Sequence, residues 1–134
     1  MKQLRVLALV AENLVPPDSL EGHSEKEIDE WKTEFDVIST LREMGHQVEV
    51  LGLSDDLTPI RSAILKRSPH IAFMLLEEFH GVVTYDQAIV SYLELMRQPY
   101  TGCNPRGLLL SKDKALTKKI LAFHRIPSPK FTVF

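Results

Sequence analysis

HIAFMLL (residues 70–76) is a nearly continuous apolar run, preceded by Ser68-Pro69 and followed by Glu77-Glu78. Such a run is typical of a strand that is covered on both faces, as strands in parallel sheets are. Residues 4–11 and 46–53 form two further apolar or alternating runs. The three runs together predict a buried, mostly parallel sheet.

Helical patterns separate these strands. Ser24 and Glu27 have the spacing of a capping box, and the apolar spacing after them is typical of an amphipathic helix that ends at Gly45. Thr58 and Pro59 predict a second helix, with Thr58 as the N-cap and Pro59 at the first position. The apolar stripe of the first helix consists of Ile28, Trp31, Phe35, Ile38 and Leu41.

The alternation continues to the end of the chain. We expect a third helix at 85–97, a short fourth strand at 99–102, a fourth helix from Ser111 and a last strand at 130–134. Strands that alternate with helices predict a small doubly wound α/β domain with helices on both faces of the sheet. Ligands bind such sheets outside the carboxyl ends of the strands, so the candidate loops are 12–24, 53–57, 77–84 and 102–111.

The composition of the 134-residue chain predicts one domain. Cys103 is the only cysteine, which excludes an intrachain disulfide and fits a reducing, cytoplasmic compartment. The apolar run at the N-terminus is short and is followed by Glu12, so we expect a strand rather than a signal peptide or membrane span. We expect neither a nucleic acid nor a membrane as partner, and a homodimer stays open.

Charge is distributed unevenly along the chain. Residues 1–58 carry thirteen acids and five bases, whereas residues 97–130 carry one acid and eight bases. A basic end can mark a site for an anionic ligand. The alternative is a solvated basic helix face, which composition alone favours.

Several common motifs are absent from the sequence. No Gly-x-Gly-x-x-Gly follows the first strand, and there is no Gly-x-x-x-x-Gly-Lys, so the usual dinucleotide and P-loop sites are not expected. No Gly-x-Ser-x-Gly nucleophile elbow occurs. The five histidines lack close metal-ligand spacing, and we expect no metal ligand within this chain.

Three short patterns could carry chemistry. His80-Gly81 follows the third strand, where an imidazole can orient a substrate or transfer protons near neutral pH; the alternative is an ordinary turn. Thr101 and Gly102, within PYTG, can direct backbone N–H groups at an anion, or simply end a strand. Lys114 lies near a helix N-terminus, which favours phosphate, or it is a solubilising lysine.

Taken together, HG (80–81), PYTG (99–102) and S-x-D-K-x-x-x-K (111–118) resemble the D-alanine–D-alanine ligase branch of the ATP-grasp superfamily. The spacing between the three motifs matches the family pattern without a gap. The motif resemblance runs from His70 to Phe134, and the strand order extends it to the whole chain. Each motif alone is a weak signal. Three motifs in register within about 40 residues favour the family over the alternative interpretation given for each motif.

The resemblance implies an N-terminal, pre-ATP-grasp domain spanning 1–134 of an ATP-dependent carboxylate–amine ligase. Such ligases form an acyl phosphate with ATP and Mg²⁺, and an amine then attacks it. Lys114 would face the ATP phosphates, while Ser111 and Asp113 would hold the start of its helix. The resemblance implies that His80 and Lys114 open onto one crevice, and it leaves the catalytic residues unassigned. The substrate-binding residues would be His80, Gly81, Tyr100, Thr101 and Gly102.

Two loops depart from the family pattern. The family has Gly-Gly-x-Ser-x-Glu after its first strand, and that glutamate cannot be carried over to Glu12 or Glu25. The family also has a Gly-Glu-Asp-Gly loop after its His-Gly. At the corresponding positions of this sequence, only Asp86 agrees with that loop. These departures put D-alanine in doubt as the substrate and leave another small-molecule carboxylate or amine open.

The family's nucleotide lies between two further subdomains, so we expect the chain to be truncated before them and to be inactive alone. The downstream ATP-grasp subdomains would be its partners in the same polypeptide. A free-standing α/β binding or interaction module without catalysis is the main alternative. A flavodoxin-like receiver or nucleotide-binding domain is the third, although Glu12 alone does not supply a receiver's acidic cluster.

Overall fold

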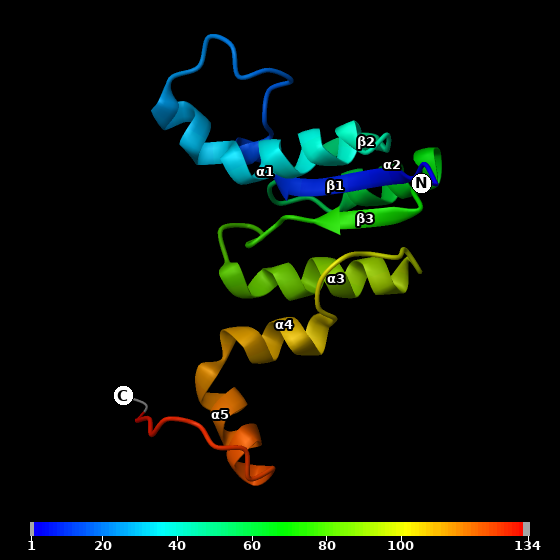
Figure 1. Cartoon of the computed structure of the whole chain (residues 1–134). Helices are drawn as coiled ribbons and strands as arrows, with labels where there is room; N and C mark the ends of the chain where they lie inside the picture. The colour runs from blue at the N-terminus through cyan, green and yellow to red at the C-terminus, as the bar shows by residue number, and fades with distance from the viewer. Residues whose placement is uncertain (1, 133–134) are drawn as a thin grey trace.

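The computed structural model describes residues 2–132 and contains one parallel sheet. Its strands are β1 (Arg5–Ala11), β2 (Gln47–Leu53) and β3 (Ile71–Met74), in the order β2-β1-β3 (Figure 1). In the register of the sheet, Leu7 lies beside Glu49 on one side and beside Ala72 on the other. The α/β fold class is therefore confirmed, and the three long apolar runs are its strands.

Helices connect and follow the strands. None of the helices that the structure describes is both long and apolar enough to cross a membrane. The α-helices are α1 (Glu25–Glu43), α2 (Thr58–Arg67), α3 (Asp86–Leu95), α4 (Pro105–Lys112) and α5 (Lys114–Phe123), and the two 3-10 turns are η1 (Glu12–Leu14) and η2 (Val83–Tyr85).

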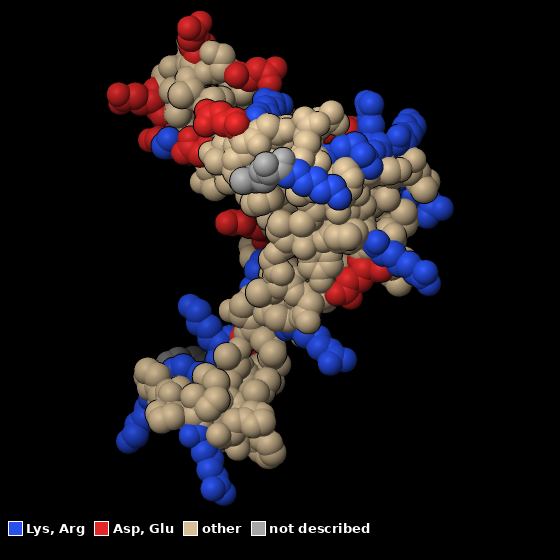
Figure 2. Space-filling view, turned by 45° about the vertical axis from the view of Figure 1, so that its right-hand side comes forward, with Lys and Arg blue, Asp and Glu red and all other residues tan. Residues whose placement is uncertain are grey.

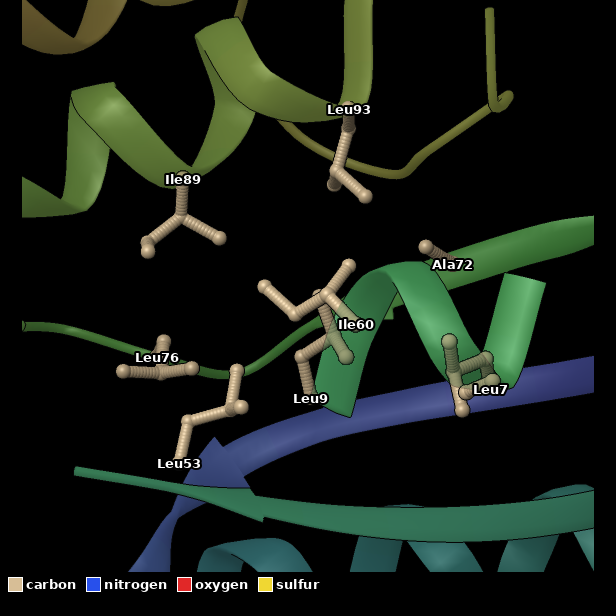
Figure 3. Packing of buried hydrophobic residues seen from close by; sticks show 9 residues of the cluster. Leu7, Leu9, Leu53, Ile60, Ala72, Leu76, Ile89 and Leu93 are labelled. Carbon is tan, nitrogen blue, oxygen red and sulfur yellow. The ribbon is translucent and has the colours of Figure 1, made fainter. Parts of the chain in front are cut away.

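The main core lies between the sheet and the helices α2 and α3. Leu7 and Leu9 of β1 point toward Ile60 of α2 and toward α3, whose Ile89 and Leu93 face them (Figure 3). Side chains alternate along a strand, so Val6, Ala8 and Val10 point to the opposite face, and they too are buried. The helix α1 lies next to β2 and η1 and buries Trp31 and Ile38. Helices therefore cover both faces of the sheet.

The predicted start of α1 is confirmed, and that of α2 differs in its cap. The capping box of α1 is present, because the Ser24 N–H donates to the Glu27 carboxylate at 2.8 Å and the Ser24 hydroxyl accepts from the Glu27 N–H. Thr58, however, is the first residue of α2 and not its N-cap. The Asp56 carboxylate accepts the Thr58 N–H at 2.8 Å, and this contact takes the place of the expected threonine cap.

Two predicted strands are not formed in the described residues. Pro99–Gly102 makes a single parallel bridge, Ala72 to Tyr100, because it runs beside β3 for only two hydrogen bonds before it turns. Residues 130–132 have no strand partner, and 133–134 lie outside the described residues. A strand needs a neighbouring strand to satisfy its backbone, which an apolar pattern alone cannot supply.

The expected loop at 102–111 contains most of α4. Asn104 caps this helix by accepting the Gly107 N–H at 2.8 Å, and Pro105 occupies its first turn. Ser111 therefore belongs to the last turn of α4, where its hydroxyl donates to the Leu108 carbonyl. The following helix, α5, begins at Lys114. The Asn-Pro pair is a recognised helix-start signal. The segment lacks the apolar periodicity that would have predicted a helix after it.

Candidate functional site

Three cavities adjoin one another along the carboxyl end of the sheet. The histidine cavity has a volume of about 390 Å³ and lies where β1 and β2 end, beside His80. The glutamate cavity, about 490 Å³, lies between α1 and the segment after β3. The lysine-112 cavity, about 340 Å³, lies between that segment, α3 and α4. Neighbouring cavities share wall residues, so they form one strip in the place where ligands bind in parallel α/β sheets.

His80 and Gly81 are the two central residues of a tight hairpin turn. The Phe79 and Val82 backbones pair across the turn, and His80 and Gly81 have φ values of 55° and 70°. A two-residue turn with both central residues at positive φ suits glycine, and histidine is among the residues that tolerate it. The His80 N–H donates to the Ser54 carbonyl at 3.0 Å, which holds the turn against the end of β2. The exposed His80 lines the histidine cavity.

The PYTG segment divides its side chains between two environments. Thr101 and Gly102 line the lysine-112 cavity, and the Thr101 hydroxyl accepts the Met74 N–H at 3.0 Å. Tyr100 instead packs against the main core and donates to the Glu94 carboxylate at 2.8 Å. Burial, followed by the bond and charge of Glu94, raises the pKa of the Tyr100 phenol. Tyr100 therefore anchors the segment, while Thr101 and Gly102 face the cavity.

Lys112 is a central cation of this region that the sequence analysis passed over. Its Nζ lies 2.7 Å from the Asp86 carboxylate and donates to the backbone carbonyls of Glu77 and Val83 at 3.0 and 2.6 Å. The Asp86 side chain is 5% exposed and that of Lys112 is 25% exposed. Lys112 thus joins α4 to both ends of the loop that carries His80. Nothing in the spacing of Lys112, Lys114 and Lys118 distinguished it beforehand.

Lys114 lies elsewhere, at the exposed start of α5. The Asp113 carboxylate caps this helix by accepting the Leu116 N–H at 2.8 Å, as the sequence predicted. Lys114 and Ser111 line a separate α5 cavity of about 370 Å³, between α5 and residues 127–129. The histidine cavity and the α5 cavity share no wall residue. The expected common crevice of His80 and Lys114 is therefore not formed, because α4 was predicted as a loop and in fact carries α5 away from the sheet (Figure 1).

The α5 cavity has the chemistry of an anion site. Its walls contain two lysines and three hydroxyls, with no carboxylate: Ser111, Lys114, Thr117, Lys118 and Ser128, besides apolar residues. Figure 2 shows the same division over the surface, with basic side chains around the end of the molecule that carries α5 and acidic ones around the end that carries the start of α1. The hydroxyls of Ser111 and Thr117 donate to the carbonyls of Leu108 and Leu110, and Lys118 donates to the Pro129 carbonyl. Lys114 is therefore the cation in these walls that is open to a phosphate. For Mg²⁺ no site is found, since the described residues contain no group of three ligands that could hold a metal.

Comparison with known proteins points to one kind of enzyme. The chain is 34% identical over 109 residues to the D-alanine–D-alanine ligase of Moorella thermoacetica, which covers 81% of this chain and 33% of that protein. It is 35% identical over 111 residues to the ligase of Aquifex aeolicus, covering 83% and 36%. The same enzyme of Coprothermobacter proteolyticus is 33% identical over 101 residues, covering 75% and 31%.

No family model matches the chain. The chain spans about a third of the length of the curated relatives it matches. It is therefore homologous to part of the D-alanine–D-alanine ligases, and the resemblance to that branch drawn from the three motifs is supported to this extent.

Proposed function

We propose that the chain is the N-terminal, substrate-side domain of an ATP-dependent carboxylate–amine ligase of the ATP-grasp superfamily. The homology to D-alanine–D-alanine ligases over four fifths of the chain carries this proposal. The arrangement of the site supports it, since His80, Thr101 and Gly102 lie along the carboxyl end of the sheet. Downstream ATP-grasp subdomains of the same polypeptide would be the partners.

The domain's contribution is binding and orientation. The Lys112–Asp86 contact holds the loop with His80 to α4. This contact keeps the imidazole at the rim of the histidine cavity. A substrate group in that cavity meets the His80 ring and the carboxylates of Glu12 and Asp55. Fixed polar groups of this kind lower the entropic cost of bringing reactants together.

Lys114 would hold a phosphate of ATP at the α5 cavity. ATP supplies the phosphoryl group that activates the carboxylate, and positive charge beside it offsets the charge of its oxygens. Lys114 has no hydrogen bond or ion pair among the described residues, so its three donors are free for such a contact. Lys118, in contrast, donates to the Pro129 carbonyl at 2.9 Å and lies 5.1 Å from the centre of the Phe131 ring.

The test uses the full-length product of the gene that encodes this chain. We expect ATP-dependent phosphate release that requires a carboxylate and an amine, and we expect Lys114→Ala to raise KM for ATP by roughly tenfold or more through loss of a charged contact. KM for the amine should stay the same. The control is Lys119→Ala, an exposed lysine of the same helix that does not line the α5 cavity.

Two outcomes would overturn parts of this proposal. Equal ATP dependence in Lys114→Ala and Lys119→Ala would remove the phosphate role of Lys114. A stop codon directly after Phe134, or no ATP turnover with any carboxylate, would instead favour a free-standing binding module.

A further inference from the structure

The glutamate cavity contains a carboxylate that opens into it and has no partner among the described residues. Glu34 of α1 is 7% exposed and lines this cavity, yet no hydrogen bond or ion pair within residues 2–132 reaches its side chain. It lies three residues after Trp31 and four before Ile38, so it occupies the buried stripe of α1. No buried side-chain oxygen of the described residues lacks a hydrogen-bond partner, so the Glu34 carboxylate keeps access to the cavity, where it is open to a ligand.

Other carboxylates surround the same space. Glu30 lies one helical turn before Glu34, and Glu77 and Glu78 follow β3 on the opposite wall. No Lys, Arg or His lines the cavity. Lys112 approaches the backbone of Glu77 from the neighbouring cavity, but its charge is paired with Asp86. The field in the cavity is therefore negative and favours a cation.

The arrangement favours an organic cation over a metal ion. The described residues contain no group of three carboxylate, thiol or imidazole ligands close enough to hold a metal. The cavity volume of about 490 Å³ lies in the range of small-molecule sites. Its apolar walls, formed by Leu14, Met74, Leu76 and Val83, suit a methylene chain. An ammonium group carried on such a chain satisfies both kinds of wall.

The same charges disfavour an α-amino acid. The carboxylate of a zwitterion would lie a few ångströms from its ammonium group, within a cavity lined by four glutamates and no base. Repulsion between like charges at that range cancels much of the attraction. The preferred ligand has a net positive charge and no carboxylate close to its amine.

We propose that the glutamate cavity binds an aliphatic amine with net positive charge, with Glu34 as the buried partner of its ammonium group. If the chain is part of a carboxylate–amine ligase, this amine is its acceptor substrate. That identification rests on the proposed function, whereas the binding does not.

The test measures binding to the 134-residue chain by isothermal titration calorimetry at 0.15 M salt, in the absence of ATP. The probes are 1,4-diaminobutane and 4-aminobutanoate, which have similar chain lengths but differ in one charged end. We expect the diamine to bind with a Kd roughly tenfold or more below that of the zwitterion. Equal Kd values, or no binding of the diamine, would overturn the proposal.

Glu34→Gln keeps the shape of the side chain and removes its charge. We expect it to weaken diamine binding by roughly tenfold or more, because a charged hydrogen bond is lost. Glu43→Gln is the control, since Glu43 is an exposed residue of the same helix outside the cavity. An equal loss in both variants would mean general charge attraction and would overturn the site.

Chemical-shift changes in the unsubstituted chain provide a second measurement that does not depend on how the variants fold. With 1,4-diaminobutane, the amide signals of Glu30, Glu34, Glu77 and Glu78 should shift together. Shifts confined to other surfaces would contradict the proposal. Diamine binding without ATP-dependent ligation by the longer polypeptide would keep this site and reject the ligase function.

Discussion

At the scale of single residues, the contact between Lys112 and Asp86 decides how the loop with His80 is held. One ammonium group meets a buried carboxylate and two backbone carbonyls, and these three partners come from both ends of the loop 77–86. A side chain with that many partners fixes a loop more firmly than the exposed ion pair Lys32–Asp36, whose two side chains are each 56% exposed.

Lys112→Met should lower the free energy of unfolding by about 2 kcal/mol, since Asp86 is left buried without its cation. Urea unfolding followed by circular dichroism measures this. Lys119→Met, at an exposed position of α5, should change stability by less than about 0.5 kcal/mol. Asp86→Asn combined with Lys112→Met should cost less than the sum of the two single changes. Equal stability of the two lysine variants would contradict the importance of the contact.

At the scale of elements, helix ends show how local sequence sets the structure. Ser24 caps α1 and Asp113 caps α5, each through a side-chain oxygen that accepts a free N–H of the first turn. The α1 cap was predicted from sequence, because a cap and its partner lie within three residues of one another. The helix with Lys114 was expected from Ser111 and in fact begins at Lys114, after its cap Asp113. The start of α2 shows the limit of this reasoning, since the N-cap position falls on Leu57, which has no capping side chain, and Asp56 accepts the Thr58 N–H instead.

The α1 capping box predicts a measurable titration. The Ser24 hydroxyl, followed by the Ser24 backbone N–H, donates to the Glu27 carboxylate and lowers its pKa below the usual 4.5. A carboxyl with a lowered pKa in the folded state stabilises the fold above its unfolded pKa, and this contribution is lost as the pH falls through the folded pKa.

Ser24→Ala should therefore raise the pKa of Glu27, as followed by the side-chain carboxyl signal in an NMR titration. Ser62→Ala, in α2 and without a hydrogen bond to Glu27, is the matched control and should leave that pKa unchanged. An unaltered Glu27 titration in Ser24→Ala would show that the capping box does not form in solution.

At the scale of the whole molecule, the sheet and its covering helices form a compact part, and the C-terminal helices α4 and α5 form an extended part. The sheet, α2, α3 and Leu76 after β3 contain the buried residues of the main core, whereas α4 and α5 bury no residue and extend away from the sheet (Figure 1). Leu116, Ile120 and Phe123 of α5 are 37%, 38% and 82% exposed. An apolar stripe with this exposure is expected where another domain packs, which agrees with the proposed downstream subdomains.

Hydrogen exchange should separate the two parts. Amides of β1 should exchange only on global unfolding, while amides of α5 should exchange roughly 100-fold faster or more through local opening, because few buried contacts hold α5. Exchange followed by NMR on the 134-residue chain measures both. With the proposed downstream subdomains attached, protection of α5 should rise. Equal protection of β1 and α5 in the shorter chain would contradict this division.

The sequence alone determined the elements whose signals are local or periodic: the three buried strands, and α1 with its capped start. These depend on neighbours within a few residues or on the period of a strand or helix. The tertiary structure alone decided that Pro99–Gly102 forms one bridge instead of a strand, that Lys112 and not Lys114 reaches the end of the sheet, and that Glu34 lies in a cavity. Each of these depends on residues far apart in the chain that meet only when the elements pack, and no local pattern encodes such a meeting.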